Sequence, residues 1–339
     1  MKTLLLSISA VLTLTSSLVW GQCCKSTTTS LNVASQDRYL DTAFNKSSLQ
    51  SSLTIKGSVD LNGWVEINAV IQSGNYNSGF NTIYNMTADE FNNLDAATKL
   101  YVKKIYLKKV MMQGNLTASL GALENRASTA QSTALSSAGW VDGVRVELKT
   151  KAGVMNMITG QIKTTEAQVF NRIKNFDLNY FEISMNRQVF EKLLVEGGLE
   201  FYQGKPLIEM ASRYDIEIAT AKIIKLIGEV KLDAHTGGVQ TSAGIQDIIS
   251  IFRTKPTDVK LAVNYEYISS QYNVNRNKLG SSIHSGYTGG ALITSVQFPI
   301  FKKLSINGFT NVRIGNQKSN FRVESGVTKT IFNKNYKKK

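Results

Sequence analysis

The sequence predicts an all-β protein, a transmembrane antiparallel up-and-down β-barrel of about 16 strands, within a range of about 14 to 18. Three observations support this fold class. Apolar and polar residues alternate along most of the chain from about residue 50, a long apolar run occurs only at residues 4–20, and proline is rare, with 3 in 339 residues. A helical membrane protein would instead show repeated apolar segments of about 20 residues.

The alternation is clearest between residues 259 and 267. Val259, Leu261, Val263, Tyr265 and Tyr267 fall on one face of an extended chain, and the lysine, alanine, asparagine and glutamate between them fall on the other. A period of two residues is typical of a strand with one apolar and one polar face. Other segments repeat the pattern and end at Gly, Asn, Asp or Lys.

Fifteen segments of this kind can be recognised, and a weakly patterned sixteenth at about 31–46 completes the even number that a closed bacterial barrel normally has. The predicted strands are 52–61, 63–73, 99–112, 114–122, 141–151, 153–164, 177–188, 190–203, 206–218, 221–233, 238–252, 257–269, 286–298, 303–315 and 320–332.

The connections between these strands predict which side of the barrel each lies on. Barrels of this kind have short periplasmic turns and long extracellular loops. An even number of strands separates consecutive long connections, so all of them fall on one side, and the short turns and the end of the last strand fall on the other. The long connections are 74–98, 123–140, 165–176 and 270–285, and the short turns lie at Asn62–Gly63, Gln113–Gly114, Ala152 and Phe190.

The chain divides into four predicted parts. Residues 1–21 are a signal peptide with Lys2, an apolar run and small residues before a cut at Gln22. Residues 22–50 are an N-terminal segment that includes the first strand, and residues 51–333 are the barrel. Residues 334–339, with four lysines, are a basic periplasmic tail. This arrangement predicts export to the outer membrane of a Gram-negative bacterium.

Cysteine use gives little further support to the fold. Cys23 and Cys24 are the only cysteines, and they are adjacent, so they cannot link distant parts of the chain. The residues before Cys23 lack the aliphatic-small-small pattern of a lipidated cysteine. Stability is therefore expected to come from the sheet itself.

A soluble β-sandwich is the main alternative, because its strands also alternate. Two features favour the barrel. The predicted strands are longer than the five or six residues or so of ordinary sheets and match the roughly nine to eleven needed to cross a bilayer at a tilt. The polar faces also carry many charges of both signs, which suits a water-filled lumen better than a packed core.

Composition and motifs argue against several function classes. The formal charge of +14 could indicate nucleic-acid binding, but an exported protein rarely meets nucleic acid. His235 and His284 both fall in predicted loops, and no cluster of His, Asp or Glu has metal-ligand spacing. The serine-rich stretch 280–286 lacks a G-x-S-x-G elbow. We therefore expect no enzyme activity, no cofactor and no metal, and we expect outer-membrane lipid, small hydrophilic solutes and a homo-oligomer or envelope protein complex as partners.

One segment fits the alternation poorly. Lys103, Lys104, Lys108 and Lys109 occupy both faces of the strand predicted at 99–112. A lysine facing lipid costs about 2 to 4 kcal/mol at mid-bilayer but about 0 to 1 kcal/mol near an interface. We therefore expect Lys103 or Lys109 to lie at the headgroup level, with its stem along the apolar surface.

The polar faces supply the candidate pore-lining residues. Acidic residues cluster on strands between 177 and 218, whereas basic residues are enriched at 99–151 and 303–322. Walls of opposite charge would create a transverse field, but the same residues could simply pair across neighbouring strands. The candidates are Lys104, Arg145, Glu147, Lys149, Glu182, Glu196, Glu200, Glu209, Arg213, Asp215, Glu217, Lys225, Glu229, Lys231, Glu266, Arg313, Arg322 and Glu324, with Glu66 as a further acidic residue.

A resemblance rests on three stretches. Residues 100–108 (LYVKKIYLK), 114–123 (GNLTASLGAL) and 139–146 (GWVDGVRV) resemble the strand-turn-strand, loop and Asp-Gly-x-Arg strand of porin-like outer-membrane barrels. The Gln22 start and the loops rich in Tyr and Asn are similar to proteins of the Bacteroidota. The resemblance covers about fifty residues and implies a passive or substrate-selective channel with Arg145 facing the lumen. No segment resembles a plug or a peptidoglycan-binding domain.

Two functions are consistent with these features. The first is a porin-like channel for passive or weakly selective passage of small hydrophilic solutes, narrowed by the loop at 74–98 or 123–140. The second is a structural or assembly subunit of an outer-membrane complex whose lumen is blocked. A wide lumen would favour the first, and a lumen filled by bulky side chains or by residues 22–50 would favour the second.

Overall fold

The computed structural model describes residues 27–42, 47–74, 76, 81–85, 99–124, 138–219, 222–248, 259–272, 288–316 and 321–338. These residues form strands, one short α-helix and two single-turn 3-10 helices. The strands are β1 (Thr27–Thr42), β2 (Ser48–Leu61), β3 (Val65–Ser73), β4 (Asn81–Asn85), β5 (Leu100–Met111), β6 (Leu116–Glu124), β7 (Trp140–Thr150), β8 (Gly153–Gln161), β9 (Tyr180–Phe190), β10 (Leu193–Tyr202), β11 (Lys205–Ala219), β12 (Lys222–Asp233), β13 (Gly238–Gln246), β14 (Lys260–Ile268), β15 (Gly289–Phe301), β16 (Ile306–Gly315) and β17 (Arg322–Lys338). The helices are η1 (Met112–Gly114), α2 (Val169–Ile173) and η3 (Lys302–Leu304).

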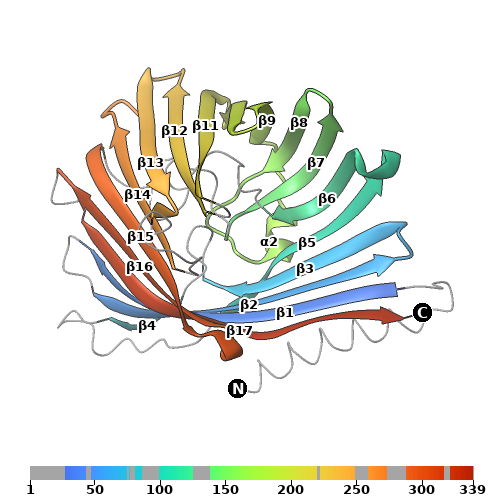
Figure 1. The fold of residues 1–339 in the computed structure, drawn as a ribbon. Coiled ribbons are helices and arrows are strands. Elements are labelled where there is room, and N and C mark those ends of the chain that lie inside the picture. Colours follow the sequence, from blue (N-terminus) through green and yellow to red (C-terminus); the bar gives the residue numbers. More distant parts are fainter. Residues whose placement is uncertain are drawn as a thin grey trace.

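The strands form one closed antiparallel ring (Figure 1). β1 pairs with β2 on one side and with β17 on the other, so the first and last strands close the barrel. The seventeen strands occupy sixteen positions, because β3 and β4 both pair with β2, at successive stretches of its length. The predicted fold class, the strand number and the weakly patterned first strand are confirmed.

Strand β4 and the end of β17 are two places where the structure departs from the sequence prediction. β4 lies inside the connection predicted at 74–98, where Asn81 and Asn85 pair with Ser51 and Ser48 of β2 and continue the position of β3. Five residues are too few to show a period of two clearly. β17 extends to Lys338, which pairs with Thr27, so most of the stretch expected as a separate basic tail belongs to the barrel wall.

The sidedness of the connections agrees with the prediction except between β13 and β14. The connections after β3 and β4, β6, β8 and β14 leave the same end of the ring, which we call the loop end. The tight turns after β2, β5, β7, β9 and β15 lie at the opposite end, the short-turn end, together with the start of β1 and the end of β17. β13 stops at Gln246 rather than at 252, so the connection to β14, which lies at the short-turn end, is longer than expected. The segments 1–21, 125–137 and 86–98 lie outside the described residues.

The outer face of the wall is apolar. Large apolar side chains at alternate positions of the strands are exposed, including Leu107, Leu120, Met210, Leu292 and Ile314. A barrel in lipid requires this alternation, because successive residues of each strand face lipid and lumen in turn. None of the described helices is long and apolar enough to cross a membrane.

Exposed aromatic residues lie near both ends of this apolar face. At the short-turn end, Trp64 in the turn after β2 is 70% exposed and Phe190 at the end of β9 is 69% exposed. Tyr265 and Tyr267 are exposed near the loop end of β14. Aromatic girdles at the two interfaces are typical of transmembrane barrels, and they mark the height of the wall that faces lipid.

A β-bulge in β5 resolves the lysines that fitted the alternation poorly. Val70 of β3 pairs with Lys104 and Ile71 pairs with Val102, so Lys103 is the extra residue. Both lysines at 103 and 104 are fully buried, and an interfacial position for Lys103 is therefore wrong. A bulge places two successive residues opposite one partner and redirects their side chains.

Lys109 takes the interfacial position instead. It lies on the same outward alternation as Leu107, near the turn that follows β5, and its Nζ lies 5.6 Å from the ring centroid of Trp64. A cation over an exposed tryptophan ring at the end of the apolar face fits a headgroup level.

Three glycines in one row bend the wall. Gly121, Gly143 and Gly160 pair with one another across β6, β7 and β8, and Tyr106 and Tyr180 end the row on either side. A Cβ atom at each glycine would overlap backbone atoms of a neighbouring strand. The row therefore needs residues without a side chain, as close backbone approach in a curved sheet does.

Candidate functional site

The inner face of the barrel wall is the candidate functional site. On β11, for example, Glu209 and Ala211 are buried, whereas Ile208 and Met210, which alternate with them, are exposed to the outside. The predicted pore-lining residues fall on this inner alternation of their strands. They are Lys104, Arg145, Glu147, Lys149, Glu182, Glu196, Glu200, Glu209, Arg213, Asp215, Glu217, Lys225, Glu229, Lys231, Glu266, Arg313, Arg322 and Glu324, and Glu66 joins them on β3.

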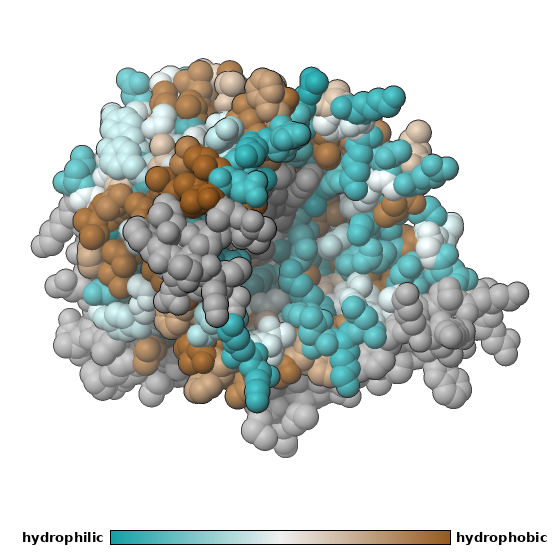
Figure 2. Space-filling view, viewed as in Figure 1, coloured by the Kyte–Doolittle hydropathy of each residue, from teal (hydrophilic) through white to brown (hydrophobic). Residues whose placement is uncertain are grey.

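The surface of the ring is hollowed on the side seen in Figure 2, and hydrophilic side chains gather along the right-hand wall of the hollow. This distribution is the reverse of a globular core, where apolar side chains point inward. A charged inner wall requires either solvent or partners for its ionised groups, because burying an unpaired charge is costly.

An acidic group occupies β9 to β11. The Tyr180 hydroxyl donates to Glu182 Oε2 at 2.6 Å and contacts Glu200 Oε2 at 3.2 Å. Lys231 of β12 forms an ion pair with Glu209 at 2.9 Å. Glu196 and Glu229 are buried nearby on the inner alternation, on β10 and β12.

A basic group lies on β5 to β7 around one carboxylate. Lys56 Nζ of β2 forms an ion pair with Glu124 Oε1 at 2.8 Å. The Arg145 guanidinium donates to the backbone carbonyl of Glu124, and the charge of Lys104 acts on the same carboxylate. Three cations thus gather around a single acidic residue at the end of β6.

A third group joins the last strands to the first. Arg38 of β1 donates to Glu324 of β17 at 2.8 Å and to Gln50 of β2 at 2.9 Å. Asn311 donates to the second oxygen of Glu324 at 3.2 Å, and Arg322 pairs with the same carboxylate. Because these bonds cross the β1–β17 junction, they also hold the ring closed.

Glu266 of β14 forms a similar centre three strands from β17. It pairs with Arg313 of β16 and accepts a hydrogen bond from Gln240 of β13 at 2.6 Å. Both charged side chains are almost fully buried. Buried charges are stable only when paired and hydrogen-bonded, as here.

The strand order places these groups relative to one another. The acidic group on β9 to β11 lies across the ring from Arg38 and Arg322 on β1 and β17, but only β8 separates it from the basic group on β5 to β7. Most of these charges have a partner of opposite sign on the same strand or on an adjacent or near strand. Pairing across strands, rather than two unbalanced walls, therefore describes the arrangement best.

The inner charges nearest the short-turn end are more exposed. Lys149 lies 4.0 Å from Glu147, and its side chain is 53% exposed. Arg213 pairs with Asp215 at 3.1 Å, and Lys225 of β12 pairs with Asp247 at 3.1 Å. Glu217 is also exposed on the inner alternation of β11.

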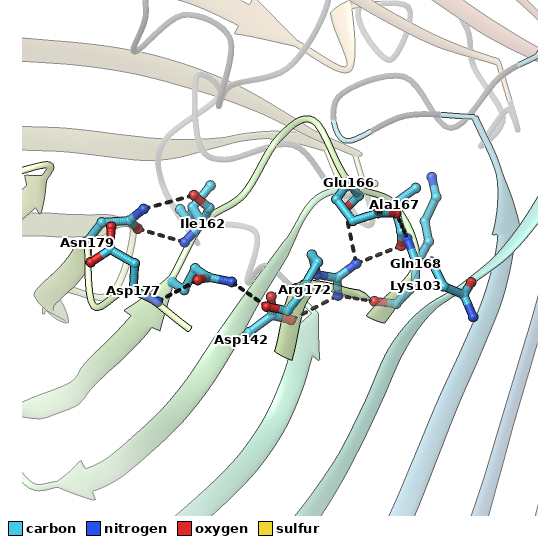
Figure 3. Close-up of polar contacts among 10 residues, drawn as sticks. Lys103, Asp142, Ile162, Glu166, Ala167, Gln168, Arg172, Asp177 and Asn179 are labelled. Carbon is cyan, nitrogen blue, oxygen red and sulfur yellow. Dashed lines mark hydrogen bonds and ion pairs between the residues drawn. The ribbon is translucent and has the colours of Figure 1, made fainter. Parts of the chain in front are cut away.

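Helix α2 and the segment before it lie beside a split between β5 and β6, and Figure 3 shows their polar contacts to Lys103 and Asp142. β5 and β6 pair only from Tyr106–Gly121 to the turn, so in the described residues their loop-end parts are not paired with each other. The Gln168 side chain accepts a hydrogen bond from the Val102 N–H at 3.0 Å, which satisfies part of the open edge of β5. The Arg172 guanidinium donates to the Lys103 carbonyl at 2.5 Å.

Arg172 fixes α2 to β7 as well as to β5. Its guanidinium forms two bonds to the Asp142 carboxylate, at 2.7 and 2.9 Å, and one to the Ala167 carbonyl at 2.6 Å. It also lies over the Trp140 ring, 4.3 Å from the centroid. Arg172 is fully buried, so this cluster is a built structural centre rather than a surface contact.

Sequence reasoning missed Arg38, Lys56, Asp142 and Arg172. Arg38 lies on a strand whose pattern was too weak to assign faces, and Arg172 lies in a predicted loop. For Asp142, the Asp-Gly-x-Arg stretch drew attention to Arg145 instead. The described residues contain no cluster of metal-ligating side chains, and His284 lies outside them.

Comparison with known proteins places the fold among outer-membrane channels. Neither a protein-family model nor a curated protein sequence matches the chain. Among solved structures, a mutant of the Rh. blastica porin matches with a TM-score of 0.55 and 9% identity, covering 89% of this chain and 99% of that one. OccD3 (OpdP) of Pseudomonas aeruginosa matches with a TM-score of 0.52 and 10% identity, covering 90% and 91%. OccK3 (OpdO) of the same organism matches with 0.52 and 9%, covering 93% and 96%. At these identities the likeness shows the fold.

Proposed function

We propose that this protein is an outer-membrane channel that lets small hydrophilic solutes pass through the barrel. The observation that carries the proposal is the contrast between the two faces of the wall. Leu107, Met210 and Ile314 on the outside are exposed and apolar, whereas Arg38, Glu209 and Glu266 inside are charged. A ring of sixteen strands is of the size that encloses a polar lumen rather than a side-chain core.

The similarity to a porin and to two Occ proteins supports this assignment, because they share the closed barrel over nearly their whole length. The proposal includes residence in the outer membrane, contact with its lipids and export by the predicted signal peptide at 1–21. It assigns transport rather than catalysis to the inner wall. The charged residues of the inner alternation would line the path and would orient passing solutes.

The proposal can be tested by solute flux into vesicles. The chain from Gln22 onward would be refolded into liposomes that are loaded with a polymer and then diluted into isotonic sugars of increasing size. A water-filled lumen predicts swelling that is fast for small sugars and falls steeply with their size. The presence of the folded barrel in the vesicles would be verified by its resistance to unfolding in cold detergent. If such vesicles swell no faster than empty vesicles, the proposal is contradicted.

A further inference from the structure

Lysines gather at the short-turn end of the barrel, on the outward alternation of two strands and in three tight turns. On β5 and β17 these lysines share the outward alternation with Leu107 and Val327. The remaining ones stand in the tight turns after β7, β9 and β15, where they are exposed. We call this set the basic belt, and it comprises Lys109, Lys151, Lys192, Lys303, Lys329 and Lys334.

The belt has little compensating negative charge. Glu191 and Asp247 are the acidic residues of the described turns at this end, and Asp247 is already paired with Lys225. In the described part of the chain, none of the ion pairs involves a lysine of the belt. The belt therefore presents positive charge over much of the circumference of the barrel.

Aromatic residues accompany these lysines. Lys109 Nζ lies 5.6 Å from the Trp64 centroid, and Lys334 Nζ lies 5.5 Å from the Phe332 centroid. Trp64 is exposed, as are Phe190 and Phe301, the last residues of β9 and β15. A tryptophan with one edge in lipid and a lysine above it form the usual composition of a membrane-water interface.

We propose that the basic belt binds anionic phospholipid headgroups in the membrane leaflet at the short-turn end. The inference rests on the barrel spanning a membrane, which is part of the proposed function. A soluble anion would account for the lysines but not for the exposed aromatic residues between them. A phosphate headgroup attached to acyl chains contacts both, because the apolar face begins directly beside the belt. Each lysine near an anionic leaflet favours binding by about fivefold at low salt.

Trp64 provides a reporter inside the belt. In the chain from Gln22 onward, the remaining tryptophan is Trp140, which is fully buried. The barrel would be refolded into vesicles of phosphatidylcholine and phosphatidylglycerol, with one or the other brominated on the acyl chain near the headgroup. Quenching of Trp64 fluorescence by each lipid gives their relative affinity for the belt, and Trp64→Phe confirms the origin of the signal.

We expect phosphatidylglycerol to be favoured several-fold at low salt, with the preference lost at about 1 M salt. Lys109→Gln should remove about fivefold of the preference. Lys174→Gln, an exposed lysine next to α2, is the matched control and should leave the preference unchanged.

Equal quenching by the two lipids at low salt would overturn the proposal, as would equal effects of the Lys109 and Lys174 substitutions. A third arm adds inorganic phosphate at matched ionic strength. If phosphate abolishes the preference and chloride does not, the belt takes free phosphate rather than a lipid, which would also overturn the proposal. These measurements do not depend on solute flux, so a barrel that is closed to sugars could still confirm lipid binding.

Discussion

The wall from β10 to β17 and the wall from β5 to β9 are built differently. In the first, the strands pair along most of their length, with register shifts at Glu217/Ala219, at Pro299/Phe301 and opposite Val33/Ala34. Charges there pair between adjacent or near strands, as Lys231 does with Glu209 and Arg313 with Glu266. In the second, a bulge at Lys103, a row of glycines and helix α2 interrupt the pattern, and Arg172 reaches between strands from outside the sheet. Local ion pairs can stabilise the first wall. The second wall depends on the cluster around Arg172, whose partners are distant in sequence.

The largest expected loss of stability follows from a substitution of Asp142, the carboxylate that pairs with Arg172. Asp142→Asn keeps the shape of the side chain but leaves the buried Arg172 guanidinium without its carboxylate. Removing one partner of a buried ion pair costs about 3 to 5 kcal/mol. We expect the free energy of unfolding, measured by urea titration in vesicles, to fall by this amount. Lys174→Gln on the same connection should change it little, and equal stability of the two variants would contradict the role of α2.

The glycine row gives a second contrast between the two walls. A methyl group at Gly143 would overlap the Thr159 carbonyl oxygen, whereas the nearest atom to a methyl group at Gly197 of β10 would be 3.8 Å away. Gly143→Ala should therefore cost about 1 to 3 kcal/mol of folding free energy. Gly197→Ala should be close to neutral. Similar unfolding midpoints for both substitutions would show that the row tolerates side chains.

A buried ion pair in the wall from β10 to β17 should be less sensitive to the loss of one partner. Glu209→Gln removes the carboxylate at 2.9 Å from Lys231, but the charge of Glu200 also acts on this lysine. We expect a loss of about 1 to 2 kcal/mol, smaller than for Asp142→Asn. Unfolding of both variants under the same conditions compares them directly. A larger loss for Glu209→Gln would reverse the proposed distinction between the walls.

The smallest effects concern exposed charges of the inner wall. Lys149→Gln removes a positive charge and should make the barrel more selective for cations, whereas Glu217→Gln should make it more selective for anions. Each shift in the permeability ratio should be about twofold or less, because water and salt screen exposed charges. Reversal potentials under a salt gradient measure the shifts. Shifts of the same sign would mean that these residues do not face the ion path.

Much of the barrel follows from local pattern. Period-two alternation locates the strands, and the lengths of the connections assign the two ends. These are properties of short stretches of chain. The position of α2 could not be predicted this way, because Arg172 lies 30 residues from Asp142 and 69 from Lys103 in sequence. Nor could the bulge, since only the register between β3 and β5 shows that Lys103 is the extra residue.

The candidate site was predictable to a similar degree. Alternation predicts which charges face inward, and Glu200 and Glu266 lie on the inner alternation of their strands. It does not indicate which charge each one meets. Arg38 and Glu324 are 286 residues apart in sequence and meet only because the barrel closes between β1 and β17. Which charge a residue pairs with therefore depends on the closed barrel, whereas the face on which it lies depends only on its own strand.

The central claim is that a charged, water-filled lumen runs through the apolar wall. Single-channel recording of the refolded chain from Gln22 onward in planar bilayers tests it most directly. An open lumen should give stable open steps on the nanosiemens scale. Barrels that are verifiably inserted but show no conductance would contradict the claim and would favour a structural role in a larger envelope complex.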